Sequence, residues 1–356
     1  MTAEGTDAST FADRVFGSSL GYFDILSMYL GVRLGLYRAL ADGPANAGEL
    51  AARAGIAERY AREWLEQQAT RGILHVDIAG GDARFALPAG HAEAILDGDS
   101  LSYVGATVGQ LMSLRNAIEA VEEAFRTGGG VPYEAYGIES VEGQGGANRP
   151  TFLTTLPNDW LPMIAPIHDR LRSGPARVAD IGCGTGWSSI AIARAYPDVT
   201  VEGFEPDEIS VELAREHAAQ AGVGDRVRFH REDAVEIARH GAFDVATAFE
   251  CIHDMARPVA VLRAAHDGLL EGGSMLIVDE RTKDRFTGEP DDLEAYFYGW
   301  SVLDCLPSGM FEQPSAGTGA VMRPSTLRRY AEEAGFASVD VLPIEHDAFR
   351  LYLLRT

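Results

Sequence analysis

The sequence predicts an α/β protein: a seven-stranded, doubly wound sheet in the C-terminal half, preceded by a smaller and mostly helical domain. From Arg177 to the end, apolar strand-like runs alternate with helical patterns, which is the arrangement of parallel strands joined by helices. The last two runs, 339–342 and 350–354, are expected to pair as antiparallel strands. Helical periodicity dominates the first 170 residues.

Size and composition narrow the possible functions. The 356 residues, 46% of them hydrophobic, suffice for two or three domains with a sizeable core. A net charge of −23 repels phosphate backbones, so no nucleic-acid partner is expected. The cysteines, Cys183, Cys251 and Cys305, form no C-x-x-C motif, which indicates a reducing compartment and no structural zinc. We find no signal peptide and no apolar run of membrane-spanning length, and expect a cytoplasmic protein without a membrane partner.

The N-terminal domain, residues 1–98, has a winged-helix pattern. We expect residues 1–16 to be frayed and 20–40 to be helical. The pattern itself has the following parts: helices 47–55 and 56–74, then strands 75–78 and 84–87 around a turn at 79–82.

A winged helix can read DNA or mediate dimerisation. The second helix carries glutamates and arginines in balance: Glu58, Glu63 and Glu66 against Arg59, Arg62 and Arg71. That balance offers phosphates little attraction. We therefore favour a packing or dimerisation module over a DNA reader.

A linking region, residues 99–165, follows. Residues 100–127 are expected to be helical, and the glycine-rich stretches 127–132 and 141–150 to be loops. Residues 152–171 again have a helical pattern, which three prolines interrupt.

The C-terminal domain, 166–356, opens with a strand at 177–181 that leads into a glycine turn. Gly182, Gly184 and Gly186 form the turn, and a helix follows from Trp187. A strand, a tight glycine turn and a helix make a pocket for a nucleotide-like ligand at the carboxyl end of the strand. In an alternative interpretation the glycines only make turns.

Two further features select the ligand. Glu205 ends the next strand, 19 residues after Gly186, near the ~20-residue offset of a carboxylate that binds ribose hydroxyls. The dinucleotide fingerprint requires a third glycine where Trp187 stands. Asp180 adds a negative charge beside the turn, which suits a cationic ligand such as S-adenosylmethionine.

Residues 178–186 resemble motif I of class I S-adenosylmethionine-dependent methyltransferases, whose fold is a Rossmann-like sheet of seven strands. The resemblance implies that the glycine turn holds the methionine part, Glu205 the ribose, and Asp233 with Ala234 the adenine. Transfer would leave S-adenosylhomocysteine as the product. The full set of expected cofactor-binding residues is Asp180, Gly182, Cys183, Gly184, Gly186, Glu205, Pro206, Asp233, Ala234, Phe249 and Glu250.

His253, at the end of the fourth strand, is the expected catalytic residue. Here the chain resembles bacterial small-molecule methyltransferases with an N-terminal winged-helix dimerisation domain, similar in architecture to the plant-type O-methyltransferases. Their His-Asp-Trp signature implies that His253 is a general base, although Met255 replaces the tryptophan. Glu280 stands where an orienting acid is found in the relatives. A second such acid is missing at 321–323, which leaves C- or N-methylation open, and His253 could instead only cap a helix.

An insertion at 282–324 is expected to form a lid over the acceptor. It is rich in aromatic residues and methionine, which suit a flat or apolar acceptor but would also suit a plain core. The residues expected to contact the acceptor are Trp160 and His168, from the linker and the helix after it, with Tyr298 and Met310 from the lid.

We therefore expect an enzyme, a homodimer through its N-terminal domain, that transfers a methyl group from S-adenosylmethionine to a small organic acceptor, with a hydroxyl as the favoured target. No metal is expected, although a metal ion held by His253 and Asp279 stays an open alternative. Two other interpretations remain: a winged-helix transcriptional regulator that senses S-adenosylmethionine, and an enzyme that uses the bound sulfonium for other chemistry.

Overall fold

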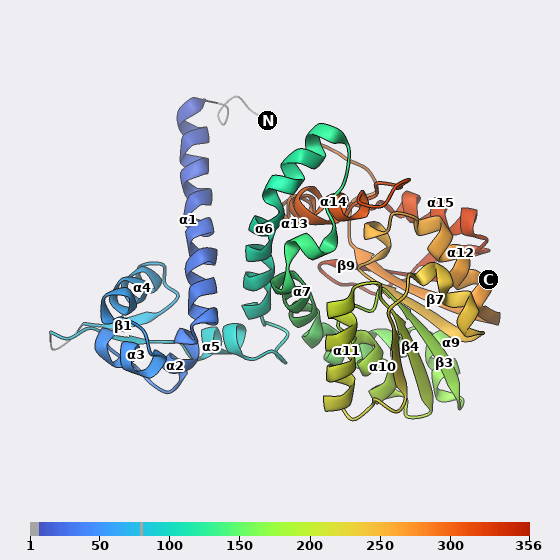
Figure 1. The fold of residues 1–356 in the computed structure, drawn as a ribbon, viewed down its shortest axis with the longest axis horizontal. Helices are drawn as coiled ribbons and strands as arrows, with labels where there is room; N and C mark the ends of the chain where they lie inside the picture. Colours follow the sequence, from blue (N-terminus) through green and yellow to red (C-terminus); the bar gives the residue numbers. More distant parts are fainter. Residues whose placement is uncertain (1–6, 79–80) are drawn as a thin grey trace. The chain divides into compact units, whose positions relative to one another are not determined.

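A computed structural model describes residues 7–78 and 81–356. The chain forms two compact units, Met1–Met112 and Ser113–Thr356 (Figure 1). The three-part division at 98 and 165, with the lid at 282–324, stays a prediction.

The first unit contains the predicted winged-helix elements. Val76 of the hairpin pairs with Phe85 in antiparallel register, while part of the predicted turn, 79–80, lies outside the described residues. The elements are α1 (Ala8–Arg33), α2 (Leu36–Ala41), α3 (Ala47–Ala54), α4 (Glu58–Thr70), β1 (His75–Asp77), β2 (Arg84–Ala86) and α5 (Ala89–Leu96).

The first helix begins earlier than the sequence indicates. The Asp7 side chain caps α1 by accepting hydrogen bonds from the backbone N–H groups of Ser9 and Thr10, at 2.9 and 3.1 Å. The prediction of a frayed end is therefore wrong from Ala8 onward. The expected helix over 20–40 is interrupted at Gly35, whose φ of 66° no regular right-handed helix adopts.

The glycine-rich stretch 141–150, predicted as a loop, is part of helix α7, so that prediction is wrong. A Cβ placed on Gly145 of α7 would lie 2.2 Å from Oγ1 of Thr185. The glycine thus serves close packing of a helix against the turn rather than flexibility. The helical segments of this region are α6 (Gly105–Thr127), η2 (Tyr133–Tyr136), α7 (Ile138–Pro150), the π-helix η3 (Thr151–Trp160), α8 (Leu161–Met163) and α9 (Ala165–Arg172).

The second unit is built on a seven-stranded sheet in the order β5-β4-β3-β6-β7-β9-β8. Only β9 runs antiparallel to its neighbours, so the predicted fold class is confirmed. The strands are β3 (Ala176–Ile181), β4 (Val199–Phe204), β5 (Val227–His230), β6 (Phe243–Phe249), β7 (Leu269–Glu280), β8 (Ser338–Val341) and β9 (Phe349–Arg355).

Helices cover both faces of this sheet. Val178 packs with α10 and α11 on one face, whereas its neighbour Ala179 packs with α12 and α15 on the other. The strand order reverses between β3 and β6, which places the ligand crevice at their carboxyl ends. The remaining segments are α10 (Trp187–Ala195), α11 (Glu208–Gln220), η4 (Ala234–His240), η5 (Ile252–Asp254), α12 (Pro258–Gly268), α13 (Asp292–Trp300), the π-helix η6 (Ser301–Cys305), α14 (Leu306–Gly309) and α15 (Pro324–Ala334).

Candidate functional site

The glycine turn after β3 has the conformation that only glycine adopts readily. Gly182, Gly184 and Gly186 have φ values of 61°, 49° and 84°. A Cβ on Gly186 would lie 2.6 Å from the Phe229 ring, so that glycine is needed for packing. A Cβ on Gly184 would meet none of the described atoms within 4 Å. The backbone at Gly184 therefore faces open space that a ligand can enter.

Glu205, at the end of β4, is aimed at this turn. Its Oε2 accepts a hydrogen bond from the Gly184 N–H at 3.1 Å, and its Oε1 accepts one from the Asp207 N–H at 3.0 Å. Burial raises the pKa of Glu205 to about 7. Each oxygen keeps a lone pair, so the carboxylate can still accept from a diol. Pro206, the next residue, is exposed.

Asp180 is fully buried beneath the turn. One carboxylate oxygen accepts from the hydroxyls of Ser188 and Ser189, both at 2.6 Å, and the other from Thr247 at 2.7 Å. Burial raises the pKa of Asp180, although the three hydroxyls oppose that shift. These contacts tie the turn to α10 and β6. A direct contact of Asp180 with a ligand stays a prediction.

The other predicted cofactor residues lie at the same carboxyl edge of the sheet. Asp233 accepts the Val235 N–H at 3.0 Å and pairs with Arg257 at 2.7 Å. Glu250 follows β6 with a φ of 51°, the one positive value among described residues other than glycine. Cys183, Ala234 and Phe249 are buried.

His253 lies in the η5 turn after β6, almost fully buried among carboxylates. Its Nδ1 is 2.9 Å from Oδ1 of Asp279 and 3.1 Å from Oε2 of Glu280, while its Nε2 is 3.2 Å from Oδ1 of Asp254. Burial alone would lower the pKa of His253, but Asp254, Glu280 and Asp279 together raise it well above its ordinary value. The ring is thus an imidazolium held on both sides by acids.

Glu280 also has a shifted acidity. Burial raises the pKa of Glu280 to about 7, against the effect of His253. Its Oε2 and Oδ1 of Asp254 are buried and ion-paired with His253, while Oδ2 of Asp279 is buried without a hydrogen-bond partner in the part of the chain that the structure describes. The site therefore has acceptor capacity that an incoming polar group can use.

Two residues of this cluster come from η6 and carried no signal in the sequence. Cys305 has its Sγ within 4.8 Å of the ligating atoms of His253 and Asp254. Burial and the charge of Asp254 raise the pKa of Asp304 to about 7, and Ser308 donates to its Oδ1 at 3.0 Å. Asp254 and Asp279 could have been found from their adjacency to His253 and Glu280. The sets His253–Asp279–Glu280 and His253–Asp254–Cys305 also have metal-ligand spacing.

The predicted lid segment reaches the His253 turn. A Cβ on Gly309 would lie 2.8 Å from the carbonyl oxygen of Asp254, and the Gly319 N–H donates to the carbonyl of His253 at 3.1 Å. Met310 follows Gly309 directly and so lies beside this turn. Tyr298 is half-exposed, and its hydroxyl accepts from Arg323 at 3.1 Å.

The two predicted acceptor residues from the linker and α9 lie in different places, and a contact of Trp160 with the acceptor stays a prediction. Trp160 is buried edge-on against His346 and Phe349, with ring centroids 5.4 and 6.2 Å apart. His168 bonds to the Tyr196 hydroxyl at 2.8 Å and lines a pocket with Pro197 and Asp198. That pocket precedes β4, at the amino ends of the strands, so the structure does not bring His168 to the His253 cluster.

Two family models match parts of the chain. Residues 173–310 match a family described as "Methyltransferase domain", and residues 25–96 match an "Rv2258c-like winged HTH domain". The first match covers the five parallel strands β3 to β7 with the glycine turn, and the second covers the helix–turn–helix with its hairpin.

Curated relatives match part of the chain. The 27-O-demethylrifamycin SV methyltransferase of Amycolatopsis mediterranei is 42% identical over 110 residues, which are 31% of this chain and 40% of that enzyme. The chain thus spans less than half the length of that relative. A ubiquinone biosynthesis O-methyltransferase of Ralstonia nicotianae is 26% identical over 193 residues, 53% of this chain and 72% of that enzyme.

Solved structures match nearly the whole chain. Mitomycin 7-O-methyltransferase MmcR is 23% identical, with a TM-score of 0.73 and coverage of 99% of this chain and 100% of that one. Human N-acetylserotonin methyltransferase, solved in complex with SAM, is 17% identical, with a TM-score of 0.68 and coverage of 100% and 99%. At these identities the likeness shows the fold.

Proposed function

Because the chain joins a winged-helix domain to a methyltransferase domain, as the resemblance implied, we propose that it is an S-adenosylmethionine-dependent enzyme that methylates a small organic molecule, with a hydroxyl as the target. The observation that carries the proposal is that the open glycine turn after β3 and the His253 cluster after β6 lie at the same carboxyl edge of the sheet, on neighbouring strands. The curated relatives named above are, by name, a 27-O-demethylrifamycin SV methyltransferase and a ubiquinone biosynthesis O-methyltransferase.

The residues at the glycine turn fit the cofactor. Gly184 leaves room for a ligand against the backbone, and Glu205 is held where it can accept from a ribose diol. Bound there, S-adenosylmethionine supplies a methyl group on a sulfonium. Three carboxyl groups near the turn, Asp180, Glu205 and Glu250, have pKa values that burial raises. A cationic ligand stabilises their ionised forms, whereas a pyrophosphate would oppose them, so the site favours a positively charged ligand.

His253 is the proposed general base, and the contacts of its two ring nitrogens indicate how it can accept a proton. Asp279 and Glu280 both face Nδ1, which fixes the ring and leaves Nε2 for the acceptor. Asp254 occupies Nε2, but 41% of its side chain is exposed, so it can turn away. An acceptor hydroxyl that displaces Asp254 also removes the charge that most raises the pKa of His253. The imidazole can then lose its proton and accept one from the hydroxyl at Nε2.

The cofactor test is direct. We expect S-adenosylmethionine to bind wild type in calorimetry, and Glu205→Ala and Gly184→Val to abolish binding while near-UV circular dichroism stays unchanged. Formation of S-adenosylhomocysteine with a panel of phenols, amines and carbon nucleophiles then separates O-, N- and C-methylation. Chelator-treated enzyme serves as the control for metal dependence. Wild-type affinity in both variants would remove this site from the proposal.

We also propose that α1 mediates a homodimer. Its apolar side chains are exposed: Phe11, Val15, Phe16, Tyr22, Phe23 and Leu30. An ion pair between Asp24 and Arg71 at 2.8 Å holds α1 to the end of α4. The indole N–H of Trp64 also donates a hydrogen bond to the Ser27 carbonyl at 2.9 Å. A contiguous apolar surface of this kind marks an interaction site.

By length and composition, with a mean hydropathy of 1.2, α1 is also long and apolar enough to cross a membrane. The expectation that the chain has no apolar run of membrane-spanning length is therefore wrong. The ion pair of Asp24 with α4 favours a protein partner, and we keep the cytoplasm as the proposed location. Light scattering should give twice the mass of one chain for the wild type. The double variant Phe16→Glu, Phe23→Glu should give the mass of a single chain. Sedimentation with phospholipid vesicles, if seen, would support the membrane instead.

A regulator that reads DNA has less support. In α4, Arg62 pairs with Glu58 at 3.2 Å and Arg59 pairs with Glu63. Arginines engaged by glutamates attract phosphates weakly. A salt-sensitive gel shift with DNA would reverse this assignment.

A further inference from the structure

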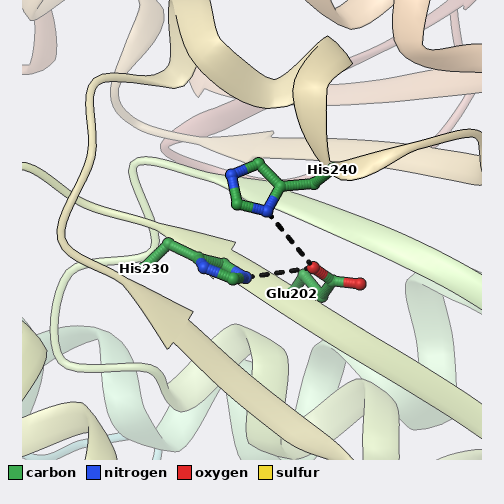
Figure 2. A group of neighbouring side chains, drawn as sticks. All are labelled: Glu202, His230 and His240. Carbon is green, nitrogen blue, oxygen red and sulfur yellow. Dashed lines mark hydrogen bonds and ion pairs between the residues drawn. The ribbon is translucent and has the colours of Figure 1, made fainter.

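A second cluster of ionisable side chains lies under η4, away from the proposed reaction. Glu202 of β4, His230 at the end of β5 and His240 at the end of η4 point toward one another (Figure 2). Oε2 of Glu202 lies 3.0 Å from Nε2 of His230 and 3.9 Å from Nδ1 of His240. One carboxylate oxygen and one nitrogen from each imidazole thus surround one point.

The surroundings orient each of these three groups. Glu232 lies 2.8 Å from Nε2 of His240 and so leaves Nδ1 turned toward Glu202. Arg177 binds Oε1 of Glu202 at 2.5 Å, which leaves Oε2 for the two histidines. A carboxylate on the second nitrogen of a ligating histidine is the usual outer shell of a metal site.

The two imidazoles are also fixed by packing on one aromatic ring. His230 stacks on Phe204 with centroids 5.0 Å apart, and His240 meets the same ring edge-on at 5.1 Å. The Glu202 side chain is 13% exposed and the two histidines are 22% exposed. A mostly shielded donor set with fixed orientations therefore exists before any ligand arrives.

We propose that Glu202, His230 and His240 bind a divalent transition-metal ion of the Zn²⁺ class. Two imidazole nitrogens with one carboxylate oxygen match Zn²⁺, whereas Mg²⁺ and Ca²⁺ select oxygen ligands. Tetrahedral ligands of Zn²⁺ lie about 3.3 Å apart, so the 3.0 and 3.9 Å separations need only small side-chain shifts. Water completes the fourth position, and the charge of Glu232 offsets that of Arg177.

The ion would join three separate segments, β4, β5 and η4. The η4 turn begins at Ala234, directly after Asp233, the residue proposed for the adenine. Metal binding would thus fasten the adenine end of the cofactor site without touching His253. This inference does not depend on the acceptor or on the type of methylation.

Zn²⁺ binding to the full chain tests the proposal. All variants are built on His253→Ala, so that ions at the other cluster do not enter the count. Chelator-stripped protein is titrated with Zn²⁺ in competition with a chromophoric chelator. We expect one ion per chain, a loss of more than tenfold in affinity in His230→Ala and in His240→Ala, and a loss of about tenfold or more in Glu232→Gln. His266→Ala, a histidine beside Asp267 at the surface, is the matched control and should bind normally.

Thermal unfolding separates lost ligands from lost fold. Zn²⁺ should raise the Tm of the parent and of His266→Ala, and leave the Tm of the two imidazole variants unchanged. Without Zn²⁺ all should unfold close to the parent. Should an imidazole variant not fold, Glu232→Gln, which keeps the volume, decides alone. No Zn²⁺ binding by the parent, or parent-like affinity in Glu232→Gln and the imidazole variants, would overturn the proposal.

Discussion

Nδ1 of His253 lies 2.9 Å from Oδ1 of Asp279, and the two side chains are only 2% and 1% exposed. Removing one partner of a buried charge pair leaves the other charge uncompensated, at about 3–5 kcal/mol. Glu280, the acid predicted to orient the histidine, contacts the same nitrogen but is 11% exposed. The geometry therefore gives Asp279 the larger share in holding the ring.

Replacing these residues ranks their roles. We expect His253→Ala to lower kcat by ~10²–10⁴ and Asp279→Asn to lower it more than Glu280→Gln does. Cofactor affinity, measured by calorimetry, should stay at the wild-type value in all three. A larger loss in Glu280→Gln than in Asp279→Asn would return the orienting role to Glu280, and an unchanged kcat in His253→Ala would remove the histidine from the reaction.

The acid limb of the pH profile reports on Asp254. Its charge is the largest cause that raises the pKa of His253. Asp254→Asn removes that charge, so the histidine loses its proton at lower pH and the acid limb of kcat/KM should move to lower pH. Asp267→Asn, at the surface beside His266, is the control and should leave the profile in place. A limb that does not move in Asp254→Asn means that His253 is not the group that titrates.

Gly145 of α7 is predicted to matter for cofactor binding. A methyl group at Gly145 would press on Thr185 in the glycine turn. We expect Gly145→Ala to weaken S-adenosylmethionine binding at least tenfold, although alanine by itself favours a helix by about 1 kcal/mol. Gly299→Ala, in α13 with open space at its Cβ, should bind normally and be slightly more stable. Equal affinity in both variants would contradict a role for this contact.

The stability of the chain should fall as pH rises from about 4 to 7. Burial raises the pKa of Asp304 to about 7, so in this window the folded chain keeps a proton that the unfolded chain, with an ordinary Asp pKa near 3.9, has released. The contribution is present at the acid end and is lost as pH rises through 7.

Asp304→Asn removes one such proton. In urea unfolding at pH 5 and pH 8, the fall in unfolding free energy between the two should be smaller in this variant, by up to about 2.5 kcal/mol. Other buried acids whose pKa values are raised contribute to the fall that remains, namely Asp180, Glu205, Glu250 and Glu280. An identical fall in both proteins would contradict a buried, protonated Asp304.

The strands were predictable because each is a buried apolar run between turn residues. Three of them, β4, β5 and β6, coincide with apolar runs that the sequence pattern marks as strands, 199–204, 227–230 and 243–249. The segment Ile138–Pro150 was missed because its glycines have the composition of a loop. The role of Gly145 is its close contact with Thr185, which lies more than thirty residues away in the sequence. Local pattern cannot report such a contact.

The acidic site was only half visible for a similar reason. His253 and Glu280 follow strands and could be placed from sequence order. Asp304 and Cys305 lie on a π-helix whose period differs from that of an α-helix, so no regular pattern assigns them to a face. His168 shows the opposite case: its helix was found, but the end of the sheet that it faces depends on tertiary packing.

The predicted lid segment is hydrogen-bonded to the His253 turn and the residues after it. The N–H of Gly319 donates to the carbonyl of His253, and the N–H of Ala316 to that of Ala256 at 2.8 Å. An outward swing of this segment would break the bond to His253, the proposed general base. In the proposed mechanism, admission of the acceptor past this segment and alignment of the base are therefore coupled, and His253 is fully anchored only while the segment stays in place.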